Sequence, residues 1–250
     1  QPFGKILKIN SKYMVSRKIK NYNNDDFFFS ALFLKAEYDN FDFGFSKSIN
    51  SGGYNDFEWS LNNAVTVIIN NKNNKLWDSI NQFYFKINAP ESEFEAYIEL
   101  GFPNKSYGEK DPGNYFNHAM GSILGFNKKN AFGYDKFLYG AEYTRLVQGT
   151  FYNLIPTPNW YDNIKYNYSS YEGRRWAAHS GSDSDDLLIY FGLYDTNKSV
   201  VYEFNYERHG VNYHYPPEVK LESRILAKYD LEKVILNVFY ENEFFEHYGF

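Results

Sequence analysis

Cysteine is missing from this 250-residue chain, and so are long apolar runs and an excess of positive charge. Without cysteine the protein has no disulfides, no thiolate metal ligands and no cysteine nucleophile. No apolar run is long enough for a membrane-spanning helix. A net charge of −5 and a pI near 5.6 argue against a phosphate-binding surface, so nucleic acid is not an expected partner.

Aromatic residues are abundant although the mean hydropathy is low. The chain holds 25 Tyr and 24 Phe, and aromatics make up 21% of its residues, yet the mean hydropathy is −0.60. Large aromatic side chains normally accompany a large apolar core. A sheet with one apolar and one polar face explains both values, because half of each strand is then polar.

Alternation of apolar and polar residues predicts β-strands along nearly the whole chain. In residues 94–100 the apolar side chains share one parity and Glu and Tyr share the other, and residues 200–206 and 219–227 alternate in the same way. Each strand is close to the roughly 9–11 residues that a tilted strand needs to cross a bilayer. Further strands are predicted near 30–38, 41–48, 58–69, 76–87, 115–126, 137–149, 185–194 and 233–245.

A soluble β-sandwich and an outer-membrane barrel share this alternation, because they differ only in which face meets water. Three features favour the barrel: the length of the strands, the many Tyr and Phe suited to interfacial girdles, and the aromatic ending FFEHYGF. We therefore predict an all-β fold, an antiparallel transmembrane β-barrel of the outer-membrane type. It forms a single domain over residues 1–250, with a weakly patterned segment at 1–28.

Connection lengths predict which ends of the strands lie outside. Bacterial barrels alternate short periplasmic turns with longer outer loops. Short turns are predicted at 38–41, where Asp-Asn is hairpin chemistry, and at 195–199 and 229–233, with 127–136 on the same side. Long loops are predicted at 101–114 and 209–218, and 150–184 is one long outer excursion.

Four short motifs over residues 137–210 resemble the Wzi family of capsule-assembly outer-membrane proteins. The motifs are Gly140-Ala141-Glu142-Tyr143-Thr144, Asn159-Trp160-Tyr161, Arg174-Arg175 followed by His179-Ser180-Gly181-Ser182-Asp183-Ser184, and Arg208-His209-Gly210. The resemblance implies a barrel in the outer membrane of a Gram-negative bacterium that acts as a lectin and holds capsular polysaccharide on the cell. The family barrel has more strands, so we interpret this chain, which opens at Gln1, as a C-terminal portion or a reduced relative.

The candidate glycan-binding residues lie in these motifs. Arginine grips carboxylates with two parallel hydrogen bonds, and flat aromatic rings stack on sugars. An internal salt-bridge network and an interfacial girdle are the plainer explanations of the same residues. The candidates are Trp160, Tyr161, Arg174, Arg175, His179, Asp183, Arg208 and His209.

No enzyme signature or cofactor motif stands out. Asp183-Ser184-Asp185-Asp186 lacks the spacing and central Gly of a calcium loop, and the chain has no Gly-x-Ser-x-Gly elbow and no HExxH. The leading hypothesis is therefore a non-enzymatic barrel without metal or cofactor, in contact with outer-membrane lipid and surface polysaccharide. The alternatives are a porin-like channel, a structural subunit that contacts other envelope proteins, and a soluble carbohydrate-binding sandwich.

Overall fold

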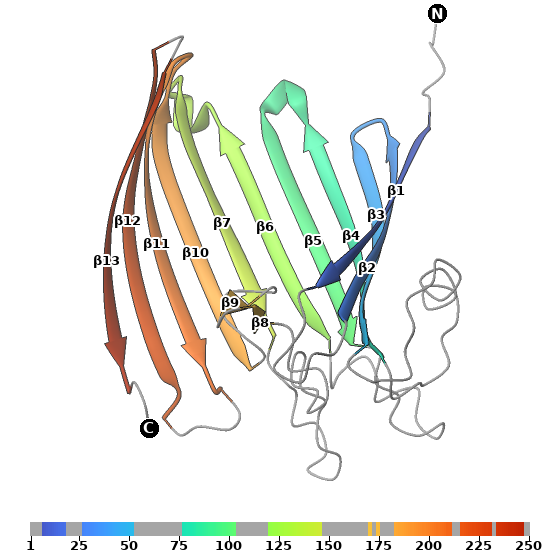
Figure 1. Ribbon diagram of the computed structural model, residues 1–250. Coiled ribbons are helices and arrows are strands. Elements are labelled where there is room, and N and C mark those ends of the chain that lie inside the picture. Colours follow the sequence, from blue (N-terminus) through green and yellow to red (C-terminus); the bar gives the residue numbers. More distant parts are fainter. Residues whose placement is uncertain are drawn as a thin grey trace, which may run out of the picture. The chain divides into compact units, whose positions relative to one another are not determined.

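The computed structural model describes residues 7–18, 27–52, 77–103, 120–146, 170–171, 174–175, 183–211, 216–231 and 234–247 (Figure 1). It describes only the backbone at 16–18, 27–28, 50–52, 77–79, 103, 170–171 and 174–175. Eleven strands form one sheet in the order β1-β2-β3-β4-β5-β6-β7-β10-β11-β12-β13. They are β1 (Lys8–Lys18), β2 (Phe27–Tyr38), β3 (Phe41–Gly52), β4 (Trp77–Ala89), β5 (Phe94–Pro103), β6 (Gly121–Lys129), β7 (Phe137–Arg145), β10 (Ser184–Tyr194), β11 (Lys198–His209), β12 (Glu218–Asp230) and β13 (Ile235–Glu246).

The prediction of an all-β, antiparallel fold is confirmed. Among the described residues, β1 and β13 each have a single neighbour in the strand order. Short 3-10 turns, η1 (Pro90–Ser92) and η2 (Ala131–Gly133), are the only helical elements among the described residues. Within those residues no helix is both long and apolar enough to cross a membrane.

Two predicted boundaries differ from the structure. β1 lies inside the segment 1–28, for which the pattern predicted no strand, because its sequence KINSKYMVSRK does not alternate cleanly. It forms a strand through pairing with β2, from Lys8↔Glu37 to Lys18↔Phe27. β6 begins later than the predicted strand at 115–126, and the strand predicted at 58–69 lies outside the described residues.

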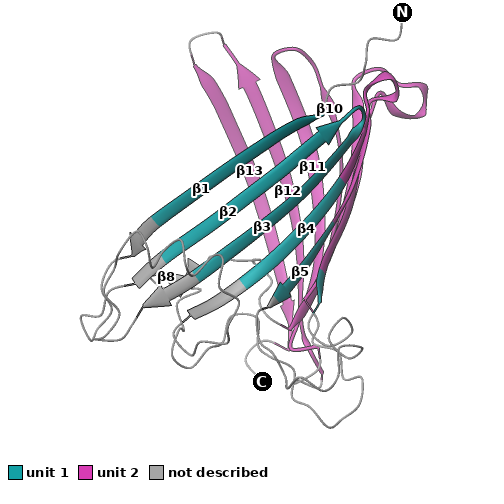
Figure 2. Ribbon diagram, turned by 90° about the vertical axis from the view of Figure 1, so that its right-hand side faces the viewer, with its two compact units in different colours: residues 1–85, 99–121, 148–182 teal, residues 86–98, 122–147, 183–250 magenta. Residues whose placement is uncertain are grey.

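Two compact units divide the chain (Figure 2). Unit 1 comprises residues 1–85, 99–121 and 148–182, and its β2–β3 hairpin confirms the predicted Asp-Asn turn. Tyr38 pairs with Phe41, and Asp39 takes a left-handed φ of 56°, a conformation that Asp tolerates better than most residues. The polar face of this unit carries a chain of hydrogen bonds, in which Ser46 donates to Gln82 over 3.2 Å and Gln82 donates to Glu99.

Unit 2 comprises residues 86–98, 122–147 and 183–250 and contains β7 and β10–β13. Its register places the apolar positions of neighbouring strands side by side: Ile189 faces Phe204, and Tyr202 faces Ile225. The charged positions also align, as in Glu203↔Arg224↔Glu241. The predicted two-faced strands at 200–206 and 219–227 are therefore confirmed, and the two faces are continuous across β10–β13.

Burial is inverted relative to a water-soluble protein. Among the described residues, the buried apolar side chains are Ala31, Ile49, Ala131 and Leu146. The buried polar residues are more numerous: Ser30, Asp42, Lys47, Thr144, Ser184, Asp185, Asp186, Asn205, Glu207 and Glu222. Large apolar side chains are meanwhile exposed, with Ile189 at 42%, Phe191 at 47% and Ile225 at 46%. Apart from Asp185 at the rim, the sheet of unit 2 thus buries its charged side chains on one face and exposes apolar ones on the other.

Candidate functional site

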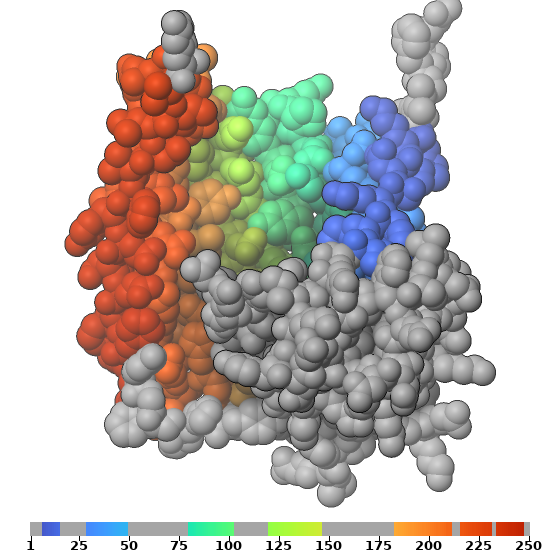
Figure 3. Space-filling model, viewed as in Figure 1, coloured from blue at the N-terminus to red at the C-terminus, as the bar shows by residue number. Residues whose placement is uncertain are grey.

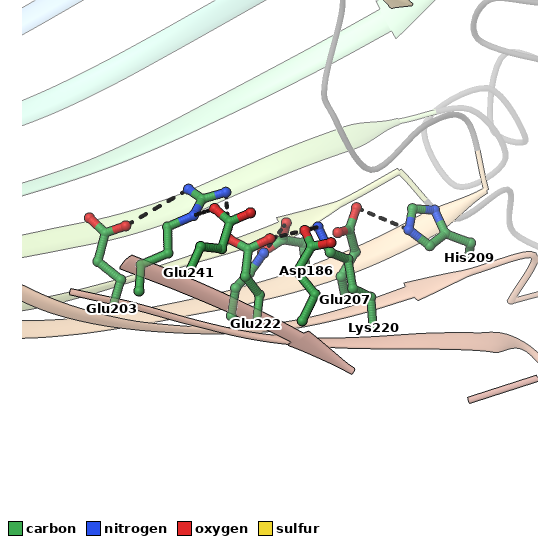
Figure 4. Close-up of polar contacts among 10 residues, drawn as sticks. Asp186, Glu203, Glu207, His209, Lys220, Glu222 and Glu241 are labelled. Atoms are coloured by element: carbon green, nitrogen blue, oxygen red, sulfur yellow. Dashed lines mark hydrogen bonds and ion pairs between the residues drawn. The ribbon is translucent and has the colours of Figure 1, made fainter. Parts of the chain in front are cut away.

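The polar face of β10–β13 carries the densest group of ionisable side chains in unit 2. We call this group the polar wall (Figure 4). The strand pairing aligns it in three rows across the sheet, because directly opposed residues share a face. The rows are Tyr190–Glu203–Arg224–Glu241, Leu188–Asn205–Glu222–Glu243 and Asp186–Glu207–Lys220–Phe245.

Two cations of β12 connect the rows. Lys220 Nζ lies 2.6 Å from Glu222 Oε2 and 2.6 Å from Glu243 Oε1. Arg224 Nη2 lies 2.5 Å from Glu222 Oε1, and its Nε lies 2.5 Å from Glu241 Oε2. Each cation pairs with one carboxylate of β12 and one of β13. The ion pairs therefore join neighbouring strands and also join residues two positions apart on β12.

Several carboxylates of the polar wall are almost fully buried. Asp186, Glu207 and Glu222 are 4%, 2% and 3% exposed. Buried charges are stable only when they are paired or hydrogen-bonded. Glu222 is held by Lys220 and Arg224, Glu207 lies 3.1 Å from His209 Nε2, and Asp186 accepts a hydrogen bond of 3.4 Å from Asn205. Removal of one partner from such a pair typically costs roughly 3–5 kcal/mol, so the wall is interdependent.

The carboxylates of Glu222, Glu241 and Glu243 converge, with ligand atoms within 4.8 Å of one another. Oxygen ligands at this spacing are those that hard cations such as Ca²⁺ prefer. Here, however, the Lys220 ammonium and the Arg224 guanidinium already occupy these oxygens. The cluster is therefore an ion-pair network, and its chemistry does not favour an additional metal ion.

A second polar group lies at the rim, where β10 begins and β11 ends. Arg208 Nε donates to Asp185 Oδ1 over 2.7 Å, and Arg208 Nη2 donates to Asp185 Oδ2, so the guanidinium grips the carboxylate with two bonds. The backbone amide of Gly210 donates to Asp183 O over 2.7 Å. Gly210 has a φ of 68°, which favours glycine because it lacks a Cβ. By their position in the alternation, Arg208 and Asp185 lie on the apolar face of the sheet, at the edge of that face.

The structure brings three of the predicted site residues together, because Ser184 pairs with His209. Asp183, Arg208 and His209 all lie at this rim, where Arg208 forms an ion pair with Asp185 and His209 Nε2 lies 3.1 Å from Glu207 Oε1. Arg174 and Arg175 form the short strand β9, which pairs with β8 (Ser170–Tyr171) inside the predicted excursion 150–184. Trp160, Tyr161 and His179 lie outside the described residues.

Sequence reasoning did not single out the polar wall. The sequence does contain the pattern, since charged residues occupy alternate positions in 203–207, 220–224 and 241–243. Which of these residues meet depends on the register between strands, and the sequence pattern alone does not specify it. The structure also leaves two buried side-chain oxygens among the described residues without a hydrogen bond, Asn127 Oδ1 and Asn205 Oδ1.

Comparison of the chain with models of protein families, with curated proteins and with solved structures finds no significant match.

Proposed function

We propose that this chain is part of an outer-membrane β-barrel whose apolar face contacts lipid and whose polar wall lines the interior. One observation carries the proposal, namely the inverted burial of the strands of unit 2. In lipid the hydrocarbon covers apolar side chains, and charged side chains must point into the protein. A water-soluble sandwich requires the opposite arrangement, with the apolar faces of two sheets packed together.

Aromatic rings on the apolar face support the same location. Near η2 in unit 2, the ring of Phe126 lies 6.5 Å from Phe94 and 5.7 Å from Tyr139, and Tyr139 lies 5.0 Å from the ring of Phe132. Phe132 is 74% exposed. Rings that gather near strand ends are typical of the girdles that outer-membrane barrels place at the membrane interface.

Within this barrel we assign the binding or anchoring of surface polysaccharide to the outer rim of the strands. The support is the sequence resemblance over 137–210, together with the gathering of Asp183, Arg208 and His209 at one rim. The guanidinium of Arg208 donates two hydrogen bonds to Asp185, so we assign Arg208 a structural role at the rim. The glycan contacts are then assigned to Trp160, Tyr161, Arg174 and Arg175.

A channel or a structural barrel subunit is the second candidate. The polar wall favours it because six carboxylates, those of Asp186, Glu203, Glu207, Glu222, Glu241 and Glu243, accompany only two permanent cations, Lys220 and Arg224. A wall with this imbalance attracts cations, whereas a purely structural interior needs no excess of either sign. Conductance across a planar bilayer separates this candidate from the polysaccharide-binding one.

Two neighbouring residues of β10 provide a test of the membrane location. Ile189→Arg places a charge on the apolar face at mid-strand, which costs roughly 2–4 kcal/mol near the bilayer midplane. Leu188→Arg places the same charge on the polar face, between Glu142 and Asn205. We expect a loss of folded protein in membranes for Ile189→Arg alone. A water-soluble sheet gives the opposite order, since exposed Ile189 then tolerates arginine better.

The polysaccharide assignment is tested by capsule retention. We expect the double variant Trp160→Ala, Arg175→Ala to shed capsule while the amount of folded barrel stays constant. Lys136→Ala is the matched control, because it removes a cation that pairs with Asp195 at the other end of the strands. Unchanged retention and unchanged binding of purified polysaccharide in a normally folded double variant contradict the assignment.

A further inference from the structure

Strand β13 has one strand neighbour, β12, among the described residues. It pairs with β12 in an unbroken register of twelve residues, from Asp230↔Ile235 to Val219↔Glu246, so no bulge disturbs it. Every residue of the strand is exposed, and much of the C-terminal surface, red in Figure 3, is open to view. In the strand order β12 is its only neighbour. One row of its backbone N–H and C=O groups is therefore without a strand partner among the described residues.

β13 lacks the basic residues, proline and bulges that protect many natural edge strands, and its charges on the polar face are the carboxylates of Glu241 and Glu243. Such strands commonly carry lysine, proline or a bulge that discourages pairing with another strand. β13 reads ILNVFYENEFFE and contains no lysine, arginine or proline. β1, the strand at the other end of the order, contains Lys8, Lys12, Arg17 and Lys18 within eleven residues. Of the two strands at the ends of the order, β13 is the one without basic residues that discourage further pairing.

The charges of the polar wall indicate what a partner strand must offer. The row Glu203–Arg224–Glu241 alternates in sign and ends at β13 on a carboxylate, and the next row ends at β13 on Glu243. Four carboxylates, Glu203, Glu222, Glu241 and Glu243, share the two cations Lys220 and Arg224. Opposite charges stabilise directly opposed residues in a sheet, so a basic residue is favoured opposite Glu241 and Glu243.

A second copy of this chain fits the edge poorly. Two copies with the same orientation in a membrane offer their β13 strands to each other only in parallel, and this sheet is built from antiparallel pairs. Pairing of two β13 edges also brings Glu241 and Glu243 close to like charges, which is destabilising.

We infer that β13 pairs with an antiparallel strand of a different polypeptide segment, which alternates apolar residues toward lipid with Lys or Arg toward the polar wall. The inference rests on the proposed membrane location, because backbone groups in hydrocarbon have no water to bond with and an open sheet edge does not occur there. The partner strand then completes the hydrogen bonds of the edge and neutralises the carboxylates at which the rows end.

Amide hydrogen exchange tests whether the edge is paired. Alternate amides of β13 point toward β12 and away from it. In native membranes we expect both sets to be protected, whereas in protein purified as a monomer in detergent the outward set exchanges at least about a hundredfold faster. Fast exchange of the outward set in native membranes overturns the inference while leaving the membrane location intact. Extraction of the chain from membranes by alkaline carbonate overturns the membrane location instead.

A photo-crosslinker identifies the occupant. Because the chain has no cysteine, Asn242→Cys provides a unique attachment point for a thiol-reactive benzophenone on the edge strand. The inference predicts a cross-linked peptide with alternating apolar residues and a Lys or Arg within one residue of the attachment site. A product with a second copy, with another segment of this chain, or with a peptide lacking a basic residue contradicts it.

Charge reversal tests the chemistry of the partner. Glu243→Lys is expected to lower the cross-link yield at least about tenfold, and Lys→Glu in the identified partner peptide restores it. Ile235→Lys is the control, since it adds the same charge to the same face of β13, opposite Asp230 and away from Glu241 and Glu243. The amount of folded Glu243→Lys protein is measured alongside, and Glu243→Gln shows what loss of the pair with Lys220 alone does. An equal loss of yield per folded protein in Glu243→Lys and Ile235→Lys contradicts the inferred basic partner.

Discussion

At the scale of single residues, the pair Arg208–Asp185 shows how a side chain suited to ligand binding is used inside the protein. Asp185 is buried and Arg208 is partly exposed, and two hydrogen bonds join them across β10 and β11. A guanidinium in this fork geometry is less free to bind an acidic sugar. The plainer of the two sequence interpretations, an internal tie, therefore has geometric support at this position.

The tie predicts a large and non-additive effect on stability. Arg208→Ala leaves a buried carboxylate unpaired, and we expect the free energy of unfolding to fall by roughly 3–5 kcal/mol. Asp185→Asn in the same background should recover part of this loss, because the uncompensated charge is removed. Arg145→Ala is the control, since Arg145 lies opposite Asp185 on β7 and is exposed. A drop in polysaccharide binding at unchanged stability in Arg208→Ala contradicts the tie.

At the scale of elements, glycines set how closely neighbouring strands and inward tyrosines approach. A Cβ on Gly125 would lie 2.3 Å from the ring of Tyr97, and one on Gly140 would lie 2.3 Å from the hydroxyl of Tyr190. Tyrosines of the polar face thus lie flat over glycines of adjacent strands, a contact that helps to fix register. At Gly192 the obstruction is backbone, with Val200 O at 2.4 Å and Val201 Cα at 2.9 Å.

These contacts predict different behaviour for two otherwise identical substitutions. Gly192→Ala should lower the free energy of unfolding by about 1–3 kcal/mol, because the β11 backbone cannot move aside without breaking its pairing. Gly125→Ala should also destabilise, but a second change, Tyr97→Ala, should relieve it, since only a side chain obstructs that position. Unfolding in urea measures both. If Val201→Ala restores the free energy of unfolding lost in Gly192→Ala, the obstruction at Gly192 comes from a side chain and not from the backbone.

At the scale of the whole molecule, the two ends of β11 adjoin chain connections of different length. Asp195 and Asn197 form a tight turn, in which the amide of Asp195 donates to Lys198 O over 2.7 Å. Lys136 Nζ donates to Asp195 Oδ1 over 2.9 Å, and this hydrogen bond, together with one from the Thr196 amide, lowers the pKa of the Asp195 carboxyl. The other end, at His209, adjoins the rim where the excursion 150–184 returns.

This asymmetry predicts the orientation in the membrane, since barrels keep short turns in the periplasm and longer loops outside. An epitope inserted after Val211 should bind antibody on intact cells, whereas one inserted after Asn197 should require permeabilised cells. Equal yields of folded protein for both insertions are the necessary control. Antibody access to Asn197 alone reverses the orientation and, with it, the assignment of the rim as the glycan-binding end.

The strands were predictable from sequence where their two faces differ strongly in polarity. Residues 219–227 alternate between apolar and charged side chains, and the strand and its faces were predicted. β1 was missed, because basic residues occupy both of its faces and only the pairing with β2 defines it. Of the candidate site, the motifs indicated Asp183, Arg208 and His209, but not that Asp185 and Glu207 are the partners of Arg208 and His209.

What the sequence determined by itself was therefore the β class, the alternation of each strand and the Asp39–Asn40 hairpin, since all three follow from the geometry of a few consecutive residues. The tertiary structure alone decided the register, and with it the polar wall and the place of β13 at the end of the strand order. The physical reason is that the ladder hydrogen bonds of a strand are made to other strands, so the meeting of Glu203, Arg224 and Glu241 depends on residues that lie apart in the chain.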